Sequence, residues 1–161
     1  MYVFMVYVRD PNFCRLLPRK LHRASSDPGR LQVMAFPPLG IQTLAPVLRQ
    51  QGHRVRLFDT CHPGMQAEHI AQAAEAEAPD VIALSCLSTT TYPALKSLAG
   101  RLKLAAPHLP IIVGGPFATM NADRILEDCS DLDCVGVGEG EELLPDYVSH
   151  LDNPGAVASL V

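Results

Sequence analysis

Residues 80–85, DVIALS, decide the fold class of this chain. Four apolar residues in a row, from Val81 to Leu84, lie between two polar ones, a pattern typical of a strand buried on both faces of a parallel sheet. The segments on either side have helical character. Residues 67–78 are rich in alanine and glutamate, and residues 90–105 carry leucines at a spacing that matches one side of a helix. A strand between two helices predicts an α/β protein.

The same alternation continues toward both ends of the chain. The predicted strands are Tyr2–Val8, His53–Asp59, Asp80–Ser85, Pro110–Val113 and Leu132–Val137. The predicted helices are Gly40–Gln51, Ala67–Ala78, Thr90–Ala105, Asn121–Cys129 and Glu141–Leu151. Because parallel crossovers are right-handed, we predict a doubly wound, five-stranded parallel sheet with the flavodoxin-like (Rossmann-like) order 2-1-3-4-5. We also expect Leu57 and Leu104 to face the core.

The size and charge of the chain narrow the classes of function. With 161 residues it has the length of one domain, and its apolar fraction of 48% fits a sheet covered on both faces. Its net charge of −4 argues against non-specific nucleic-acid binding, which needs a basic surface. The apolar start, Met1–Val8, is cut short by Arg9 and predicts no membrane span. The 5 cysteines show no paired spacing, which indicates free thiols in a reducing cytoplasm.

Three loops that follow predicted strands are small and polar or rich in glycine. They are residues 85–91 (SCLSTTT), 114–116 (GGP) and 138–140 (GEG). In an open parallel sheet, ligands bind beyond the carboxyl ends of the strands, where all three loops would meet. Glycines let a ligand approach the backbone closely, and hydroxyl groups offer hydrogen bonds without bulk. The sequence therefore predicts a bulky polar ligand at this edge.

Several familiar sites are absent from the sequence. No P-loop motif is present, and Glu141 occupies the third glycine position of the dinucleotide-binding pattern that Gly136 and Gly138 would begin. The segment Asp59–His62 has no second histidine or cysteine group at ligand spacing, so we interpret it as a strand-end cap with a loop histidine. The sequence pairs no serine or cysteine nucleophile with a nearby general base and an orienting acid. We therefore predict no catalytic residue and no metal ligand in this chain.

The rim loops carry a resemblance to a known family. Ser85-Cys86-Leu87 follows the third predicted strand, Gly114-Gly115 follows the fourth, and the run 40–55 looks like a helix that leads into a strand. In this order, these features resemble the cobalamin-binding domain. Members of that superfamily carry an aspartate and an axial histidine before the helix, but Ala35 and Pro37 occupy those positions here.

The departure at Pro37 is itself similar to one branch of the superfamily. Pro37-Pro38-Leu39-Gly40, Gly115-Pro116 and the acidic run 138–142 resemble the amino-terminal domain of cobalamin-dependent radical SAM enzymes. The resemblance implies cobalamin bound base-off without an axial histidine. It implies a cobalamin-binding domain over 1–151 and, at 152–161, the start of a linker to a radical SAM domain in cis. That absent domain would hold S-adenosylmethionine and a 4Fe-4S cluster, and the expected reaction is methyl transfer, with ring closure in some relatives.

The resemblance also assigns roles to rim residues. Ser85 would hydrogen-bond the dimethylbenzimidazole base and Leu87 would pack against it, while Gly114 and Gly115 would leave room for the nucleotide tail. Residues 37–40 would lie beneath the cobalt. The full set of expected cofactor-binding residues is Pro37, Pro38, Leu39, Gly40, Thr43, Ser85, Leu87, Ser88, Thr89, Thr90, Gly114, Gly115, Pro116, Gly138, Glu139 and Gly140.

Two other classes of function stay open at this point. The chain could be a flavin- or nucleotide-binding flavodoxin-like module, in which the hydroxyl groups of residues 85–91 hold a phosphate. It could also be a non-catalytic interaction domain that uses the arginines and lysine within residues 9–30.

Overall fold

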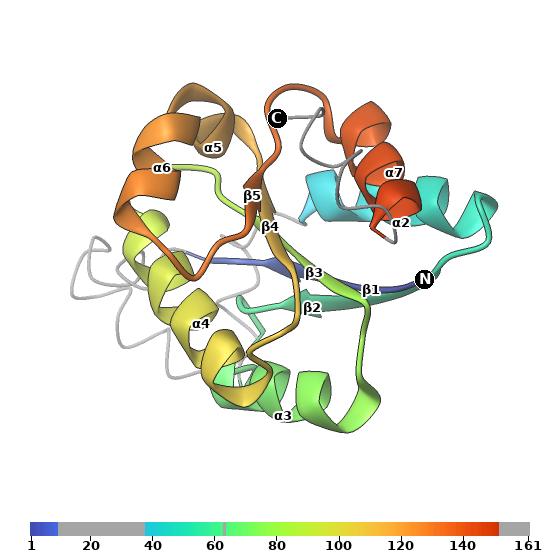
Figure 1. Cartoon of the computed structure of the whole chain (residues 1–161), viewed down its shortest axis with the longest axis horizontal. Helices are drawn as coiled ribbons and strands as arrows, with labels where there is room; N and C mark the ends of the chain where they lie inside the picture. Colours follow the sequence, from blue (N-terminus) through green and yellow to red (C-terminus); the bar gives the residue numbers. More distant parts are fainter. Residues whose placement is uncertain (10–37, 63, 152–161) are drawn as a thin grey trace, which may run out of the picture.

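The fold is taken from a computed structural model that describes residues 1–9, 38–62 and 64–151. Within these residues, five strands form one parallel sheet in the order β2-β1-β3-β4-β5, which confirms the predicted topology (Figure 1). The strands are β1 (Tyr2–Tyr7), β2 (Arg54–Asp59), β3 (Val81–Ser85), β4 (Ile111–Gly114) and β5 (Cys134–Val135). The helices are α2 (Leu39–Gln50), α3 (Ala67–Glu77), α4 (Tyr92–Ala105), α5 (Pro116–Met120), α6 (Ala122–Asp128) and α7 (Gly140–His150).

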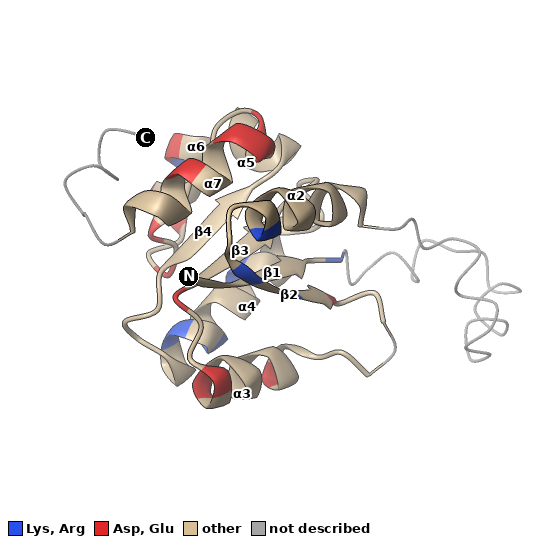
Figure 2. Ribbon diagram, turned by 90° about the vertical axis from the view of Figure 1, so that its right-hand side faces the viewer, with Lys and Arg blue, Asp and Glu red and all other residues tan. Residues whose placement is uncertain are grey.

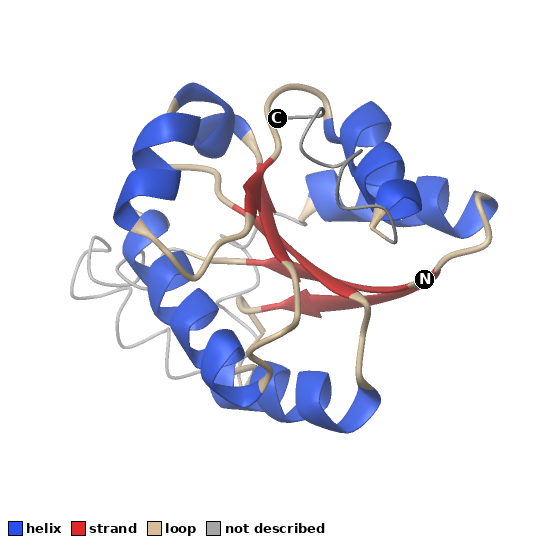
Figure 3. Cartoon of the chain, viewed as in Figure 1, coloured by secondary structure: helices blue, strands red, loops and turns tan. Residues whose placement is uncertain are grey.

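Helices cover both faces of the sheet (Figure 3). On one face, Phe4, Ile82 and Ile111 pack against α3, α4 and α6. On the other face, Val3 and Ile112 pack against α2 and α7. Successive side chains of a strand point to opposite faces, so each buried strand contributes to both cores and reads as a continuous apolar run. This is the physical basis of the DVIALS pattern.

The described helices include none that combines the length and the hydropathy needed to cross a membrane. The charged residues of the described part of the chain lie on the outside of the layers. Figure 2 shows acidic residues on α6 and α7, which carry Asp123, Glu127, Asp128, Glu141, Glu142 and Asp146.

The edge strand β2 is covered less well than predicted. Leu57 is 36% exposed, so the expectation that it is buried is wrong. An edge strand has a neighbour on one side alone, which leaves part of its surface open to water. Two arginines occupy this strand. The Arg54 guanidinium lies 3.4 Å from the centre of the Tyr2 ring, and Arg56 forms an ion pair with Glu77 of α3.

Helix α4 is confirmed, but one of its predicted core residues is not. Leu95, Leu98 and Leu102 are buried, whereas Leu104 is 86% exposed. At 100° per residue, position 104 lies opposite the side that positions 95 to 102 share, so the expectation for Leu104 is wrong.

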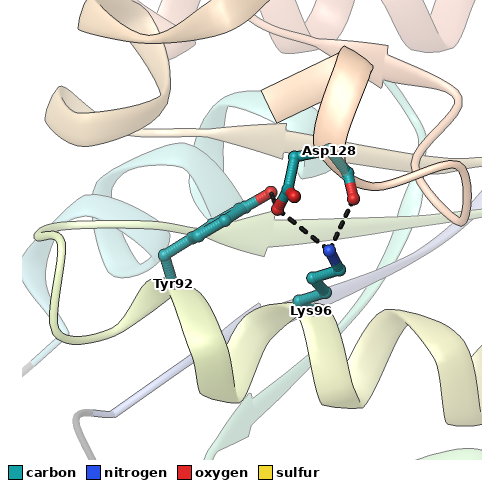
Figure 4. A network of polar contacts seen from close by, with 3 residues as sticks. All are labelled: Tyr92, Lys96 and Asp128. Carbon is teal, nitrogen blue, oxygen red and sulfur yellow. Dashed lines mark hydrogen bonds and ion pairs between the residues drawn. The ribbon is translucent and has the colours of Figure 1, made fainter. Parts of the chain in front are cut away.

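A polar network joins α4 to α6 (Figure 4). The Tyr92 hydroxyl donates to Asp128 Oδ2 over 2.9 Å, and Lys96 Nζ donates to the same oxygen over 2.9 Å. The hydrogen bond from Lys96, followed by that from Tyr92, holds the pKa of Asp128 below its ordinary value. Burial, together with Asp128, raises the pKa of Tyr92.

The region after β4 differs from the prediction in two respects. The short helix α5 was not expected; it begins at Pro116, directly after Gly115, and proline is favoured at the first turn of a helix. Strand β5 has two residues, Cys134 and Val135, instead of the predicted run 132–137. The chain leaves the sheet through Gly136 and Gly138, and Gly138 has a positive φ of 106°. A glycine backbone of this kind ends strand geometry.

Candidate functional site

A cavity of about 520 Å³ lies at the carboxyl ends of β3 and β4, on the face that α2 and α7 cover. Its lining is mainly apolar. It comprises Met5, Gly40, Ile41, Leu44, Ala83, Leu84, Ser85, Leu87, Ile112, Val113, Gly114, Gly115, Pro116, Thr119, Met120, Gly136, Gly138, Glu139, Gly140, Glu141, Leu143 and Leu144. A cavity of this size and character is typical of a site for an organic ligand.

The floor of the cavity is made of small residues at the end of the sheet. Ala83 pairs in register with Ile112, and Ser85 pairs with Gly114. Ala83, Ser85 and Gly114 follow the strand alternation that places Val81 and Ile112 toward α2 and α7. A Cβ atom at Gly114 would meet no atom within 4 Å, so the space above this residue is open. Helices that rest on larger residues deeper in the sheet cannot fill the space above these small ones.

Gly115, next to Gly114, allows the loop after β4 to pack closely against the loop after β3. Its φ is 104°, and a Cβ atom there would lie 2.8 Å from the carbonyl oxygen of Cys86. That carbonyl accepts a hydrogen bond from Phe117 N at 3.2 Å, and Cys86 N donates to the Gly114 oxygen at 2.8 Å. The turn after β4 therefore packs tightly on the loop after β3, and glycine is required for this contact.

Helices α2 and α7 close the opposite side. Leu44 of α2 lies 3.2 Å from the position that a Cβ atom of Gly140 would take, so the start of α7 sits directly against α2. The Thr43 hydroxyl donates to Glu141 Oε1 over 3.1 Å and links the same two helices. Thr119 of α5 accepts a hydrogen bond from Gly138 N at 3.2 Å, which fixes the loop before α7. The exposed carboxylates in the first turn of α7 suit the positive end of that helix.

Ser85 is the polar side chain on the floor. Its Oγ atom accepts a long hydrogen bond from Val8 N, at 3.4 Å, and its own hydroxyl proton remains available to a ligand. The thiol beside it is inert, because burial raises the pKa of Cys86 to about 11. This arrangement can bind and orient a ligand, but it offers no activated nucleophile among the described lining residues.

The structure gathers most of the expected binding residues around the cavity. Those in the lining are Gly40, Ser85, Leu87, Gly114, Gly115, Pro116, Gly138, Glu139 and Gly140. Those outside the lining are Pro38, Leu39, Thr43, Ser88, Thr89 and Thr90. Ser88 Oγ lies 3.0 Å from the hydroxyl oxygens of both Thr90 and Thr91, so its contacts are within its own loop. Pro37 lies outside the described residues.

Sequence reasoning missed the helical walls and α5. Ile41 and Leu44 stand at helical spacing in the predicted helix 40–51, but their contribution to a cavity depends on what the facing strands leave empty. Leu143 and Leu144 lie in the predicted helix 141–151, and no role was expected for them. Thr119 gave no signal, because α5 was not predicted.

The segment Asp59–His62 forms a cap, as interpreted from the sequence. Asp59 Oδ1 accepts a hydrogen bond from Cys61 N at 2.8 Å, which turns the chain after β2. Among the described residues, no three His, Cys, Asp or Glu side chains gather as a metal site.

The family is decided by a match over most of the chain. A family model described as the B12 binding domain matches residues 33–148. The chain belongs to this family. Cobalamin is accordingly the cofactor of this B12-binding domain, which sets aside the flavin module and the interaction domain as alternatives. The cavity fits one part of that cofactor, because its open floor at Gly114 and its apolar walls suit a flat aromatic group.

Relatives of this B12-binding domain are longer proteins. Hopanoid C-3 methylase of Methylococcus capsulatus is 32% identical over 124 residues, which are 74% of this chain and 23% of that protein. Anaerobic magnesium-protoporphyrin IX monomethyl ester cyclase of Synechocystis is 28% identical over 125 residues, or 77% of this chain and 25% of that protein. The chain thus spans about a quarter of the curated relatives it matches.

A solved structure shares the fold of this B12-binding domain. The cobalamin-dependent S-adenosylmethionine radical enzyme OxsB with aqua-cobalamin bound superposes with a TM-score of 0.68 at 20% identity. The match covers 94% of this chain and 19% of that chain.

Proposed function

We propose that the chain binds cobalamin base-off, with the nucleotide tail detached from cobalt and inserted into the cavity between the sheet and helices α2 and α7. The single observation that carries this proposal is the open space above Gly114, beside Ser85 on the neighbouring strand. A tail bound to its own cobalt would not need a slot of about 520 Å³ in the protein.

The residues of the chain have distinct tasks in this proposal. Ser85 donates a hydrogen bond from its hydroxyl group to the ring nitrogen of the base, which becomes free when the base leaves cobalt. Leu87, which is 47% exposed and lines the cavity, packs against the ligand and excludes water. Gly138, Glu139 and Gly140 flank the other side, where α7 begins.

The lower face of the cobalt carries no histidine from the usual motif. Proline occupies the histidine position, Pro37, and its ring offers neither a donor nor a lone pair to a metal. Bound cobalamin supplies a cobalt centre that can accept and pass on a methyl group; the protein supplies binding and orientation. With Pro37 at this position, the motif would leave the lower side of a bound cobalt without a protein ligand.

We further propose that the chain is the cofactor domain of a radical SAM enzyme, with residues 1–151 as the domain and 152–161 as the start of a linker. The methylase and cyclase names of the relatives support a reaction of this kind, with methyl transfer as the first expectation. The S-adenosylmethionine and the iron–sulfur cluster would then belong to the other domain, and this chain alone should show no turnover with cobalamin and S-adenosylmethionine.

Electron paramagnetic resonance of the bound cobalt(II) form tests the binding mode. We expect a spectrum without hyperfine splitting from an axial nitrogen. His22 is the one histidine of the sequence between β1 and α2. With protein labelled with ¹⁵N, ¹⁴N splitting that persists in a His22→Ala variant would mean that the base stays on cobalt and would overturn the proposal. Splitting that disappears in this variant would identify His22 as a ligand and would overturn the empty lower face.

A further inference from the structure

We infer that the cavity selects corrinoids by their lower base and favours benzimidazoles over purines. This inference rests on the proposed function, because it assumes that the base enters the cavity. Natural corrinoids share one ring and differ in this base. A site that holds the base can therefore distinguish them, whereas a site that holds the ring alone cannot.

Among the described side chains of the floor, Ser85 carries the hydroxyl, and the rest are apolar. The other hydroxyl of the lining, Thr119, belongs to α5, and its oxygen already accepts a hydrogen bond from Gly138 N. Around Ser85 lie Met5, Ala83 and Ile112 from the sheet, and the leucines of α2 and α7 face them. Val8 N already donates to Ser85 Oγ, so this hydroxyl has one proton to give. A detached dimethylbenzimidazole presents one ring nitrogen that accepts a proton donor, and its methyl groups are apolar. Its hydrogen-bonding needs match those of the floor.

Adenine has needs that the described side chains of the floor do not meet. Its exocyclic amine carries two N–H donors, which require acceptors once water is excluded. The nearby backbone carbonyls each already use one of their two lone pairs within the fold: Gly114 O accepts from Cys86 N at 2.8 Å, and Val113 O from Gly136 N at 2.8 Å. Gly115 O accepts from Thr119 N at 2.9 Å. The carboxylates of the lining, Glu139 and Glu141, are on exposed residues at the start of α7.

The size of the discrimination follows from the cost of an unpaired donor. Leaving a buried donor without a partner weakens binding by about 5- to 150-fold. A hydrophobic pocket alone discriminates weakly between ligands of similar shape, but a polar group without a partner is strongly rejected. The purine is thus disfavoured by its hydrogen-bonding groups, although its ring system is no larger than that of the benzimidazole.

Titration of three ligands into the chain tests the inference. They are cobalamin, its analogue with adenine as the lower base, and cobinamide, which has no nucleotide. The change in the corrin absorption spectrum measures the affinity of each. We expect cobalamin to bind about 5- to 150-fold more tightly than the adenine analogue. Equal affinity of these two, with cobinamide weaker, would overturn the inference and leave the proposed function intact. Equal affinity of cobalamin and cobinamide would overturn the proposed function, because the base would then contribute nothing.

A variant separates the chemistry of the wall from its shape. Leu143→Gln places an amide oxygen in the lining on a half-buried position of α7, where the fold tolerates it. We expect this variant to bind the adenine analogue more tightly than the wild type does, which reduces the ratio of the affinities for cobalamin and the analogue. Leu104→Gln makes the same chemical change on an 86% exposed leucine of α4, and the preference should not move. A preference that is the same in Leu143→Gln and Leu104→Gln would count against selection by the wall.

Discussion

Ser85 and Gly114 are register partners at the ends of two neighbouring parallel strands, and both face the helices α2 and α7. One brings a hydroxyl group and the other brings no side chain at all. A donor thus stands beside an open space at the edge of the sheet. The pair explains why a site can form here without any charged residue on the floor.

Filling the space above Gly114 should abolish cobalamin binding. The leucine side chain of Gly114→Leu would occupy the cavity and leave no room for the base. The fold should survive, because a Cβ atom at this position meets nothing within 4 Å. Spectral titration measures the affinity and thermal unfolding checks the fold. The control is Ala76→Leu, which places the same side chain at an exposed position of α3. Loss of binding in both variants would contradict the placement of the base above Gly114.

A methyl group at Gly115 should instead destabilise the protein. Gly115→Ala forces a positive φ on alanine and places its Cβ atom 2.8 Å from the Cys86 carbonyl oxygen. Strain of this kind costs about 1–3 kcal/mol of unfolding free energy. Denaturant titration should show the loss, with Gly114→Ala as the matched neighbour that keeps wild-type stability. Equal denaturation midpoints for the two variants would show that Gly115 is no more important for stability than Gly114.

The end of α3 offers a stabilising change. Ala78 caps this helix in the left-handed conformation, with φ 46° and ψ 64°, which glycine adopts without strain. Ala78→Gly should raise the unfolding free energy by about 0.5–1 kcal/mol. Ala76→Gly, two residues earlier inside the helix, should lower it by a similar amount. If both substitutions lower the unfolding free energy, the left-handed conformation of Ala78 does not cost the wild-type protein stability.

The link between α4 and α6 should make stability depend on pH at the acid end. The pKa of Asp128 is lower in the folded chain than in the unfolded one, because Lys96 and Tyr92 hydrogen-bond the carboxylate. Its contribution is therefore present above the unfolded pKa and is lost as pH falls through the folded pKa. Asp128→Asn should melt below the wild type at neutral pH, and the two melting temperatures should converge in acid. A constant difference at every pH would exclude this carboxylate as the source.

The strands and their order could be read from the sequence because continuous apolar runs, such as Val81 to Leu84, arise where helices cover both faces. The rim loops followed from the same logic. The exact length of β5 could not be read, because a strand next to glycines ends where hydrogen bonds stop, and this depends on neighbouring segments. Helix α5 is too short to show periodicity.

The cavity was predictable in its position but not in its walls. Ser85 and Gly114 stand at strand ends that any parallel sheet would bring together. Leu44 and Leu143 become wall residues because α2 meets α7, which is a tertiary contact without a local signal. The role of Pro37, outside the described residues, stays a prediction.

The two edges of the sheet have a consequence for how copies of this domain behave when concentrated. Exposed strand edges are templates on which other chains can pair and grow into aggregates. Here β5 offers only the two residues Cys134 and Val135, too short a template to seed a strand. At the other edge, Arg54 places like charges on any two β2 strands that approach each other, whereas the charge of Arg56 is balanced by Glu77. Edge-to-edge association is thus opposed at β5 by the short length of the strand and at β2 by charge repulsion.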